Sequence, residues 1–217
     1  RLLFIVSLVF CLFCTPLVGF ANPTEEEKAK YEEAISESQR KFMGTLWNTY
    51  AFYVLYAEID KFDGSKHNIK DCKLSMMDKW IVSEFNKLAK QVDAYLGDYV
   101  TTEPARLINT FVDSLSNWYV RRSRERFWVH GETEDKTAAF ATLYYVLVEF
   151  SKLAAPFVPS ITEQIYQNLV CSVDKNAPIS VHLCDYPVAD ENLIDEELNL
   201  GMETVLGISN LGHSARN

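Results

Sequence analysis

Four arginines within six positions are the residues of this 217-residue chain whose type and spacing could do chemistry. They are Arg121, Arg122, Arg124 and Arg126, and the stretch WYVRRSRERFW places them between Trp118 and Trp128. Guanidinium groups bind phosphate oxygens through paired hydrogen bonds and stack on aromatic rings, so a nucleic-acid backbone would suit them. Ion pairs with neighbouring carboxylates, or a solvated helix face, would explain the same residues without any ligand.

A helical projection divides the four arginines between two faces. When each residue advances about 100°, Arg122 and Arg126 fall at about 40° and 80° from Trp118. This places them in an apolar sector formed by Ile108, Phe111, Val112, Leu115 and Tyr119. We therefore expect Arg122 and Arg126 to form structural ion pairs or to line a groove, because a buried unpaired guanidinium is too costly. Arg121 and Arg124 fall on the outer face, where phosphate contact is possible.

Other side chains do not assemble into a catalytic or metal site. Cys171, His182 and Cys184 could bind a metal, but their spacing is not that of a metal motif, and packed side chains explain them better. The chain has no glycine-rich phosphate loop, dinucleotide fingerprint or nucleophile elbow. We expect no catalytic residue, no metal ligand and no cofactor bound by this chain.

The net charge of −9 disfavours a generally basic RNA-binding protein, but the charge is unevenly distributed. Residues 24–37 hold six acidic and two basic side chains, and residues 190–203 hold six acidic side chains and no basic one. The 152 positions between them carry 17 basic and 18 acidic groups. A local basic patch in this nearly neutral middle is therefore compatible with phosphate binding.

The first 21 residues and the cysteines give opposite indications of the compartment. An apolar run, RLLFIVSLVFCLFCTPLVGFA, has the length of a signal sequence or membrane span, and a sequence artefact would explain it equally. Five cysteines do not form an evident disulfide framework, which favours a reducing cytoplasm. Membrane attachment or secretion is expected only if residues 1–21 are authentic.

Apolar residues recur at helical spacing through most of the remaining chain, which predicts an all-α antiparallel bundle. We expect helices at about 24–60, 75–96, 102–128, 135–155, 160–169 and 190–211. Capping boxes are expected at Thr24 and at Ser160 with Glu163, and Ser75 with Asp78 is expected to start the second helix. One short strand is expected at 179–183, where β-branched residues precede Pro187.

Long segments of the chain resemble the isoleucyl-tRNA synthetase family. They are AISESQRKFMGTLWNTYAFYVLYAEID (34–60), MDKWIVSEFNKLAKQVDAYLGDYVTTEPARLINTFVDSLSNWYVRRSRERFW (77–128) and KLAAPFVPSITEQIYQNLV (152–170), followed by SVHLCDYP (180–187). The resemblance covers about residues 33–206, and the arginine stretch makes it specific to the isoleucine enzymes. It implies that residues 33–170 are the helical anticodon-binding bundle of a class I synthetase.

The resemblance also sets the expected domains and activity. Residues 22–32 would be an acidic helix start or linker, and residues 171–217 a truncated C-terminal extension. The HIGH and KMSKS signatures of the family's catalytic core are absent from the sequence. The parent ligase would join isoleucine to its tRNA with ATP and Mg²⁺, whereas this chain alone is expected to be inactive. Its expected partners are the anticodon stem-loop of isoleucine tRNA and the missing catalytic domain.

The resemblance raises particular residues as RNA contacts. Arg121 and Arg124 become candidates for the phosphate backbone, with Arg40, Lys41 and Arg106 as further candidates. Trp118, Tyr119 and Trp128 would pack in the core or stack on an unpaired base. The alternative function is a secreted or membrane-anchored helical interaction protein that reuses the bundle, and a product of a faulty gene model is the third possibility.

Overall fold

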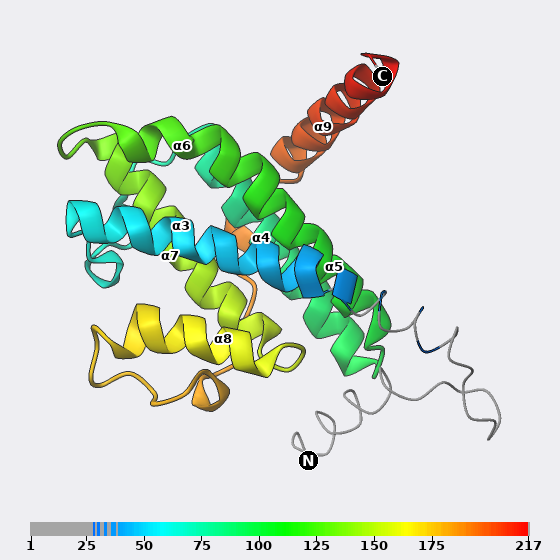
Figure 1. Cartoon of the computed structure of the whole chain (residues 1–217), viewed down its shortest axis with the longest axis horizontal. Coiled ribbons are helices and arrows are strands. Elements are labelled where there is room, and N and C mark those ends of the chain that lie inside the picture. Colours follow the sequence, from blue (N-terminus) through cyan, green and yellow to red (C-terminus); the bar gives the residue numbers. More distant parts are fainter. Residues whose placement is uncertain (1–27, 29, 31–32, 34–35, 38, 217) are drawn as a thin grey trace.

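The computed structural model describes residues 28, 30, 33, 36–37 and 39–216. Helices account for all the regular structure in this part of the chain, which confirms the predicted all-α bundle (Figure 1). The apolar run at 1–21 and the predicted capping box at Thr24 lie outside the described residues. None of the helices within them combines the length and apolarity that crossing a bilayer requires.

The described residues before Gln39 are helical, and the π-helical turn η1 (Gln39–Met43) then leads into α3 (Gly44–Asp60). Two short 3₁₀ turns, η2 (Gly64–Lys66) and η3 (Ile69–Asp71), then lead to α4 (Met76–Gly97). Ser75 and Asp78, the predicted start of this helix, form a capping box: each side chain accepts a hydrogen bond from the other residue's backbone N–H. This box fixes where α4 begins and orients the carboxylate of Asp78.

A single long helical segment carries the four arginines. It consists of α5 (Thr102–Asp113), the π-helical η4 (Ser114–Val120) and α6 (Arg121–Trp128). The predicted helix from 102 to 128 is therefore present, but a π-helix interrupts its regular winding immediately before the arginines. This interruption changes which side chains face the core.

The second half of the bundle contains α7 (Glu134–Ala154), α8 (Pro159–Tyr166) and the π-helical η5 (Gln167–Cys171). The predicted capping box at Ser160 is wrong, because α8 starts one residue earlier, at Pro159, after Val158. The carboxylate of Glu163 instead accepts hydrogen bonds of 2.9 Å from Ser180 Oγ and Val181 N. Glu163 thus ties the following loop to α8.

The strand predicted at 179–183 is also wrong. The segment forms a 3₁₀ turn, η6 (Val181–Leu183), in which Ser180 Oγ accepts a hydrogen bond from His182 N. The β-branched residues there have no neighbouring strand within the described chain with which to pair, and the side chain of Glu163 takes one of the backbone donors instead.

The predicted C-terminal helix is divided into η7 (Glu191–Leu193) and α9 (Glu196–Arg216). Asp190 accepts a hydrogen bond from Asn192 N at the start of η7, and Asp195 accepts one from Leu198 N at the start of α9. Asp195, which lies between the two elements, therefore starts α9 as a separate helix. The first part of α9 packs on α4, and its far end projects away from the bundle in Figure 1.

The hydrophobic core lies where α3, α4, α5, η4 and α7 meet. Aromatic rings fill much of it, and several of them contact one another edge-on, including Phe127 of α6 with Phe140 of α7 at 4.8 Å between ring centroids. Phe52 of α3 contacts Phe127 in the same way at 5.1 Å. The end of α6 is consequently held between α3 and α7.

Candidate nucleic-acid interface

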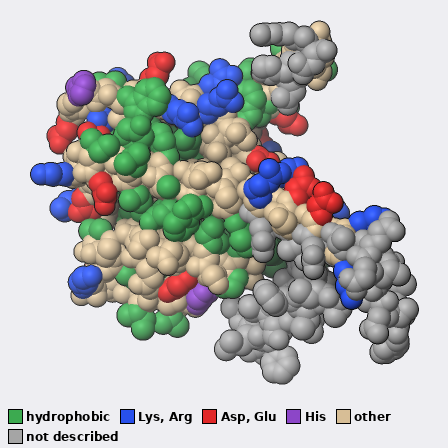
Figure 2. Space-filling view, in the orientation of Figure 1, with side chains coloured by type: hydrophobic (Ala, Val, Ile, Leu, Met, Phe, Trp, Pro, Cys, Tyr) green, Lys and Arg blue, Asp and Glu red, His purple; other side chains and the backbone are tan. Residues whose placement is uncertain are grey.

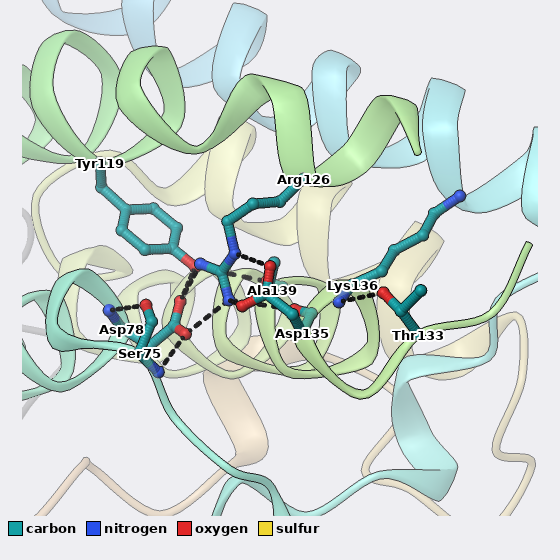
Figure 3. A network of polar contacts seen from close by, with 8 residues as sticks. All are labelled: Ser75, Asp78, Tyr119, Arg126, Thr133, Asp135, Lys136 and Ala139. Atoms are coloured by element: carbon teal, nitrogen blue, oxygen red, sulfur yellow. Dashed lines mark hydrogen bonds and ion pairs between the residues drawn. The ribbon is translucent and has the colours of Figure 1, made fainter. Parts of the chain in front are cut away.

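The guanidinium of Arg126 binds a buried carboxylate and is largely shielded from solvent. Its Nη1 and Nη2 atoms each donate a hydrogen bond of 2.8 Å to Asp78, one to each carboxylate oxygen. The Tyr119 hydroxyl donates a third hydrogen bond to Asp78, at 2.7 Å. Figure 3 shows these side chains converging from α4, η4 and α6. The exposed fraction is 16% for the side chain of Arg126 and 0% for that of Asp78, so this is a buried ion pair.

A second carboxylate completes the surroundings of Arg126. Its Nε atom donates to Asp135 of α7 at 2.9 Å, and Nη2 donates to the Asp135 backbone oxygen at 3.0 Å. Burial alone would raise the pKa of Asp78, but hydrogen bonds from Arg126 and Tyr119 outweigh it and lower that pKa. Burial alone would lower the pKa of Arg126, and its bonds to the two carboxylates raise it instead. Arg126 therefore remains charged and serves the fold.

Arg122 lies on the surface, although the helical projection put it on the core face. Each π-helical turn inserts about one extra residue, which rotates the following side chains by roughly 100° relative to an α-helix. After η4 the core positions are Ser123 and Phe127, each 1% exposed, one residue later than the projection gave. Arg122 is displaced outward, while Arg126 remains at the edge of the core.

Three arginines on α6 are thus exposed: Arg121, Arg122 and Arg124. No carboxylate of the described residues lies within ion-pair distance of any of them. The guanidinium carbon of Arg122 lies 5.2 Å from the centre of the Trp118 ring, and that of Arg124 lies 6.0 Å from the Phe52 ring of α3. A guanidinium over a ring keeps its in-plane N–H groups available, so both can still bind a bidentate anion.

The remaining candidate cations form a separate group. Lys41 makes an ion pair of 2.5 Å with Glu37, and Arg106 makes one of 2.8 Å with Glu103. Arg40 is exposed in η1, which packs against α3 and α5. Arg106 and Arg122 are separated by roughly 24 Å along their shared helix. The structure therefore does not bring the five predicted contacts together: Arg121 and Arg124 lie at one end, and the other three near α5.

The three aromatic candidates have different exposures. Tyr119 is fully buried at 0% and donates to Asp78, so its ring is part of the core. Trp118 is half-buried beneath Arg122. Trp128, at the end of α6, is 52% exposed. Figure 2 shows the basic side chains over α6 and a hydrophobic patch beside them at the end of this helix.

The cysteines and histidine near the C-terminus do not form a cluster of ligands. The thiols of Cys171 and Cys184 donate to backbone oxygens of Pro178 and Ser180, at 3.4 and 3.7 Å, and His182 is exposed. Within the described residues, no three His, Cys, Asp or Glu side chains are arranged to hold a metal ion. Cys171, His182 and Cys184 therefore do not come together as metal ligands in this part of the chain.

Sequence reasoning missed two residues that shape this surface. Asp78 was considered only as a residue at the start of its helix, and a buried acid in an otherwise apolar helix face was the available signal for a partner such as Arg126. Phe52 was not considered, because its contact with Arg124 joins residues 72 positions apart and leaves no local pattern. The tertiary structure alone shows that α3 supports the arginines of α6.

Comparisons with known proteins show which family this chain resembles. Residues 78–217 match the family model described as the anticodon-binding domain of tRNA ligase. The chain is 52% identical over 189 residues to an isoleucine–tRNA ligase of Clostridium kluyveri and 54% identical over 187 residues to that of Clostridium acetobutylicum. Each alignment covers 86% of this chain and 18% of the relative. An isoleucine–tRNA ligase of Dehalococcoides mccartyi is 46% identical over 196 residues.

The chain thus spans less than a fifth of the length of these curated relatives. The relatives give no support to the alternative of a secreted or membrane-anchored interaction protein. The match to the family model covers more than half of the 217 residues, including all of α4 to α8 except the first two residues of α4. The chain belongs to the family of tRNA-ligase anticodon-binding domains, and its sequence is similar to the isoleucine–tRNA ligases of that family.

Proposed function

We propose that this chain is the anticodon-arm-binding part of an isoleucine–tRNA ligase and that the exposed arginines of α6 contact the RNA backbone. The single observation that carries the proposal is the exposure of Arg121, Arg122 and Arg124 without carboxylate partners among the described residues. They are exposed, they lack ion pairs with the described residues, and two of them are oriented by stacking on aromatic rings. Such arginines are suited to phosphate oxygens.

The contrast with Arg126 supports this division of roles. Arg126 is saturated by two carboxylates, and the network anchors α6 to α4 and α7. A protein with a net charge of −9 would gain from pairing its other arginines in the same way. Their lack of carboxylate partners favours a partner outside the described chain that carries negative charge.

The parent reaction would be the ATP-dependent attachment of isoleucine to its tRNA, with Mg²⁺ bound by the nucleotide-binding part of the ligase. Because the HIGH and KMSKS signatures are missing from these 217 residues, the role of this chain is to hold the RNA rather than to activate the amino acid. We place it in the cytoplasm, where tRNA is used.

Trp128 is proposed as a second type of RNA contact. It is exposed beside the arginines and could stack on an unpaired base of the anticodon loop, which would be worth about 1–3 kcal/mol. Trp128→Ala is expected to weaken binding of a hairpin more than binding of a fully paired duplex with the same number of phosphates. Trp47→Ala, which removes a tryptophan of similar exposure on α3, is the matched control.

The proposal is tested by fluorescence anisotropy with the anticodon arm of isoleucine tRNA. The variant Arg121→Ala/Arg122→Ala/Arg124→Ala should raise Kd by at least about tenfold, since each charge-assisted contact is worth about 1 kcal/mol or more. The control, Lys70→Ala/Lys90→Ala, removes cations that are paired with Asp190 and Glu191 and should change Kd by less than about threefold. Equal affinities for both variants and the wild type would refute the assignment.

A further inference from the structure

Lys136 is a buried lysine at an unfavourable position in its helix. It is the third residue of α7, where the positive end of the helix dipole disfavours a cation. Its side chain is only 7% exposed, although lysine is rarely buried unless partners compensate for the lost hydration. The contacts of the ammonium group must therefore offset both costs.

The ammonium group of Lys136 joins the ends of two other helices. Its Nζ atom forms an ion pair of 2.6 Å with Asp60, the last residue of α3, and donates a hydrogen bond of 2.8 Å to the backbone oxygen of Val129, where α6 ends. Helix C-termini favour a cation, because the dipole is negative there. Figure 3 shows this side chain extending away from the Arg126 network. Lys136 thus connects α3, α6 and α7 at one point.

The loop between α6 and α7 has little packing of its own. Every residue from 128 to 135 is exposed, whereas Phe127 and Lys136 on either side are buried. Gly131, with a φ of 85°, and Glu132 line a hollow of about 440 Å³ that Lys136 also lines. The loop therefore borders open space rather than the core, and the bond from Lys136 fixes its backbone at Val129.

This bond acts on the residue directly after Trp128. Phe127, in the core, fixes the chain on one side of Trp128, and the bond between Val129 and Lys136 fixes it on the other. The Trp128 ring is 52% exposed, so its own packing orders it only in part. A binding side chain that is already held in place loses less conformational freedom when it meets its ligand. Fixing the backbone around Trp128 should therefore strengthen its stacking.

We propose that Lys136 is a positioning residue that holds Trp128 where its ring can stack on an unpaired base of the RNA. The inference rests on the proposed function, and specifically on Trp128 as a base contact. Lys136 does not touch the RNA in this account, because its side chain is buried. Support of the bundle without any effect on Trp128 is the competing interpretation.

The test measures the preference of the 217-residue chain for a hairpin, by fluorescence anisotropy. The probes are the anticodon arm of isoleucine tRNA and a fully paired duplex with the same number of phosphates. Lys136→Met removes the ammonium group and keeps an apolar stem. The loss of one positive charge weakens binding of both probes, so the ratio of the two Kd values isolates the effect on stacking. Lys152→Met, which breaks an ion pair of 2.6 Å with Glu149 within α7, is the matched control.

Lys136→Met should reduce the preference for the hairpin at least about threefold, a part of the five- to 150-fold that a stacking contact of about 1–3 kcal/mol supplies. Lys152→Met should leave the preference unchanged within about 1.5-fold, because its pair is exposed and remote from α6. In the Trp128→Ala background, Lys136→Met should have no further effect on the ratio. An unchanged preference in Lys136→Met, or an equal reduction with and without Trp128, would overturn the proposal.

The same series separates this inference from the proposed function. If Trp128→Ala reduces the preference and Lys136→Met does not, base stacking by Trp128 stands and the positioning role alone is refuted. If Trp128→Ala leaves the preference unchanged, stacking and positioning are both refuted. The backbone contacts of Arg121, Arg122 and Arg124 are judged separately, from the salt dependence of the affinity.

Hydrogen exchange provides a second measurement that needs no RNA. The backbone amides of the peptide 127–133 should exchange at least about threefold faster in Lys136→Met than in the wild type or Lys152→Met. Equal exchange rates would overturn the proposal. If circular dichroism shows that Lys136→Met does not fold, Asp60→Asn replaces it, since this change weakens the ion pair and retains the lysine. It should shift the Kd ratio and the exchange rate in the same directions by smaller factors, and no shift in either would refute the positioning role.

Discussion

Replacing Asp78 with alanine removes the carboxylate that Arg126 and Tyr119 share. Asp78 is 0% exposed and accepts two hydrogen bonds from Arg126 and one from Tyr119. Removing one partner of a buried ion pair costs about 3–5 kcal/mol, because the other charge stays buried without compensation. In a chain of this size the corresponding fall in Tm is roughly 6–20 °C. Urea unfolding followed by circular dichroism measures the change.

Two further variants separate the ion pair from general disruption. Glu103→Ala breaks the exposed pair with Arg106 and should change the free energy of unfolding by less than about 1 kcal/mol. Asp78→Ala/Arg126→Met removes both charges and should recover at least about 1 kcal/mol relative to Asp78→Ala alone. If Asp78→Ala costs no more than Glu103→Ala, the network does not anchor α6 and the structural account of Arg126 is refuted.

Three further predictions concern packing, pH and an unsatisfied hydroxyl. Gly64→Ala should cost about 1–3 kcal/mol in urea unfolding, because a Cβ there would collide with the ring of Tyr144, whereas Gly44→Ala meets nothing within 4 Å and should cost nothing. The pKa of Asp78 is lower in the folded state, so its ionised carboxylate stabilises the fold fully above the unfolded-state pKa of about 3.9, and this stability is lost as pH falls through the folded-state pKa. Asp78→Asn should therefore show a shallower fall of Tm with decreasing pH over that acid range. A fall of Tm as steep as that of the wild type would contradict this. Ser123→Ala should be neutral or stabilising by up to about 1 kcal/mol in the same unfolding assay, because the buried Ser123 hydroxyl has no hydrogen-bond partner among the described residues. A loss above about 1 kcal/mol would show that it has one.

The helices could be predicted from the sequence because their signals are local. Apolar spacing identified α4 and α7, and Ser75 with Asp78 marked the start of α4 correctly. Local signals failed where a side chain bonds to a distant segment. Glu163 has the spacing of a capping residue, yet it binds the loop at 180–181, and the same contact replaces the predicted strand with a 3₁₀ turn.

The arrangement of the arginines could be predicted only in part. An α-helical projection holds as far as Leu115 and Tyr119, both 0% exposed, and loses its register through the π-helical η4. No sequence pattern indicated that extra residue, so Arg122 was placed on the wrong side. The contact of Arg124 with Phe52 depends on how α3 crosses the helix, which a single-helix analysis does not contain.

The dependence of RNA affinity on salt concentration tests the central claim most directly. Binding of the 217-residue chain to the anticodon arm of isoleucine tRNA would be measured from low to physiological salt, beside the variant Arg121→Ala/Arg122→Ala/Arg124→Ala. Each lost phosphate contact lowers the slope of log K against log salt by about 0.7–0.9, so the slope should fall by roughly two to three. Identical slopes for the variant and the wild type would show that these arginines do not meet phosphate and would contradict the account.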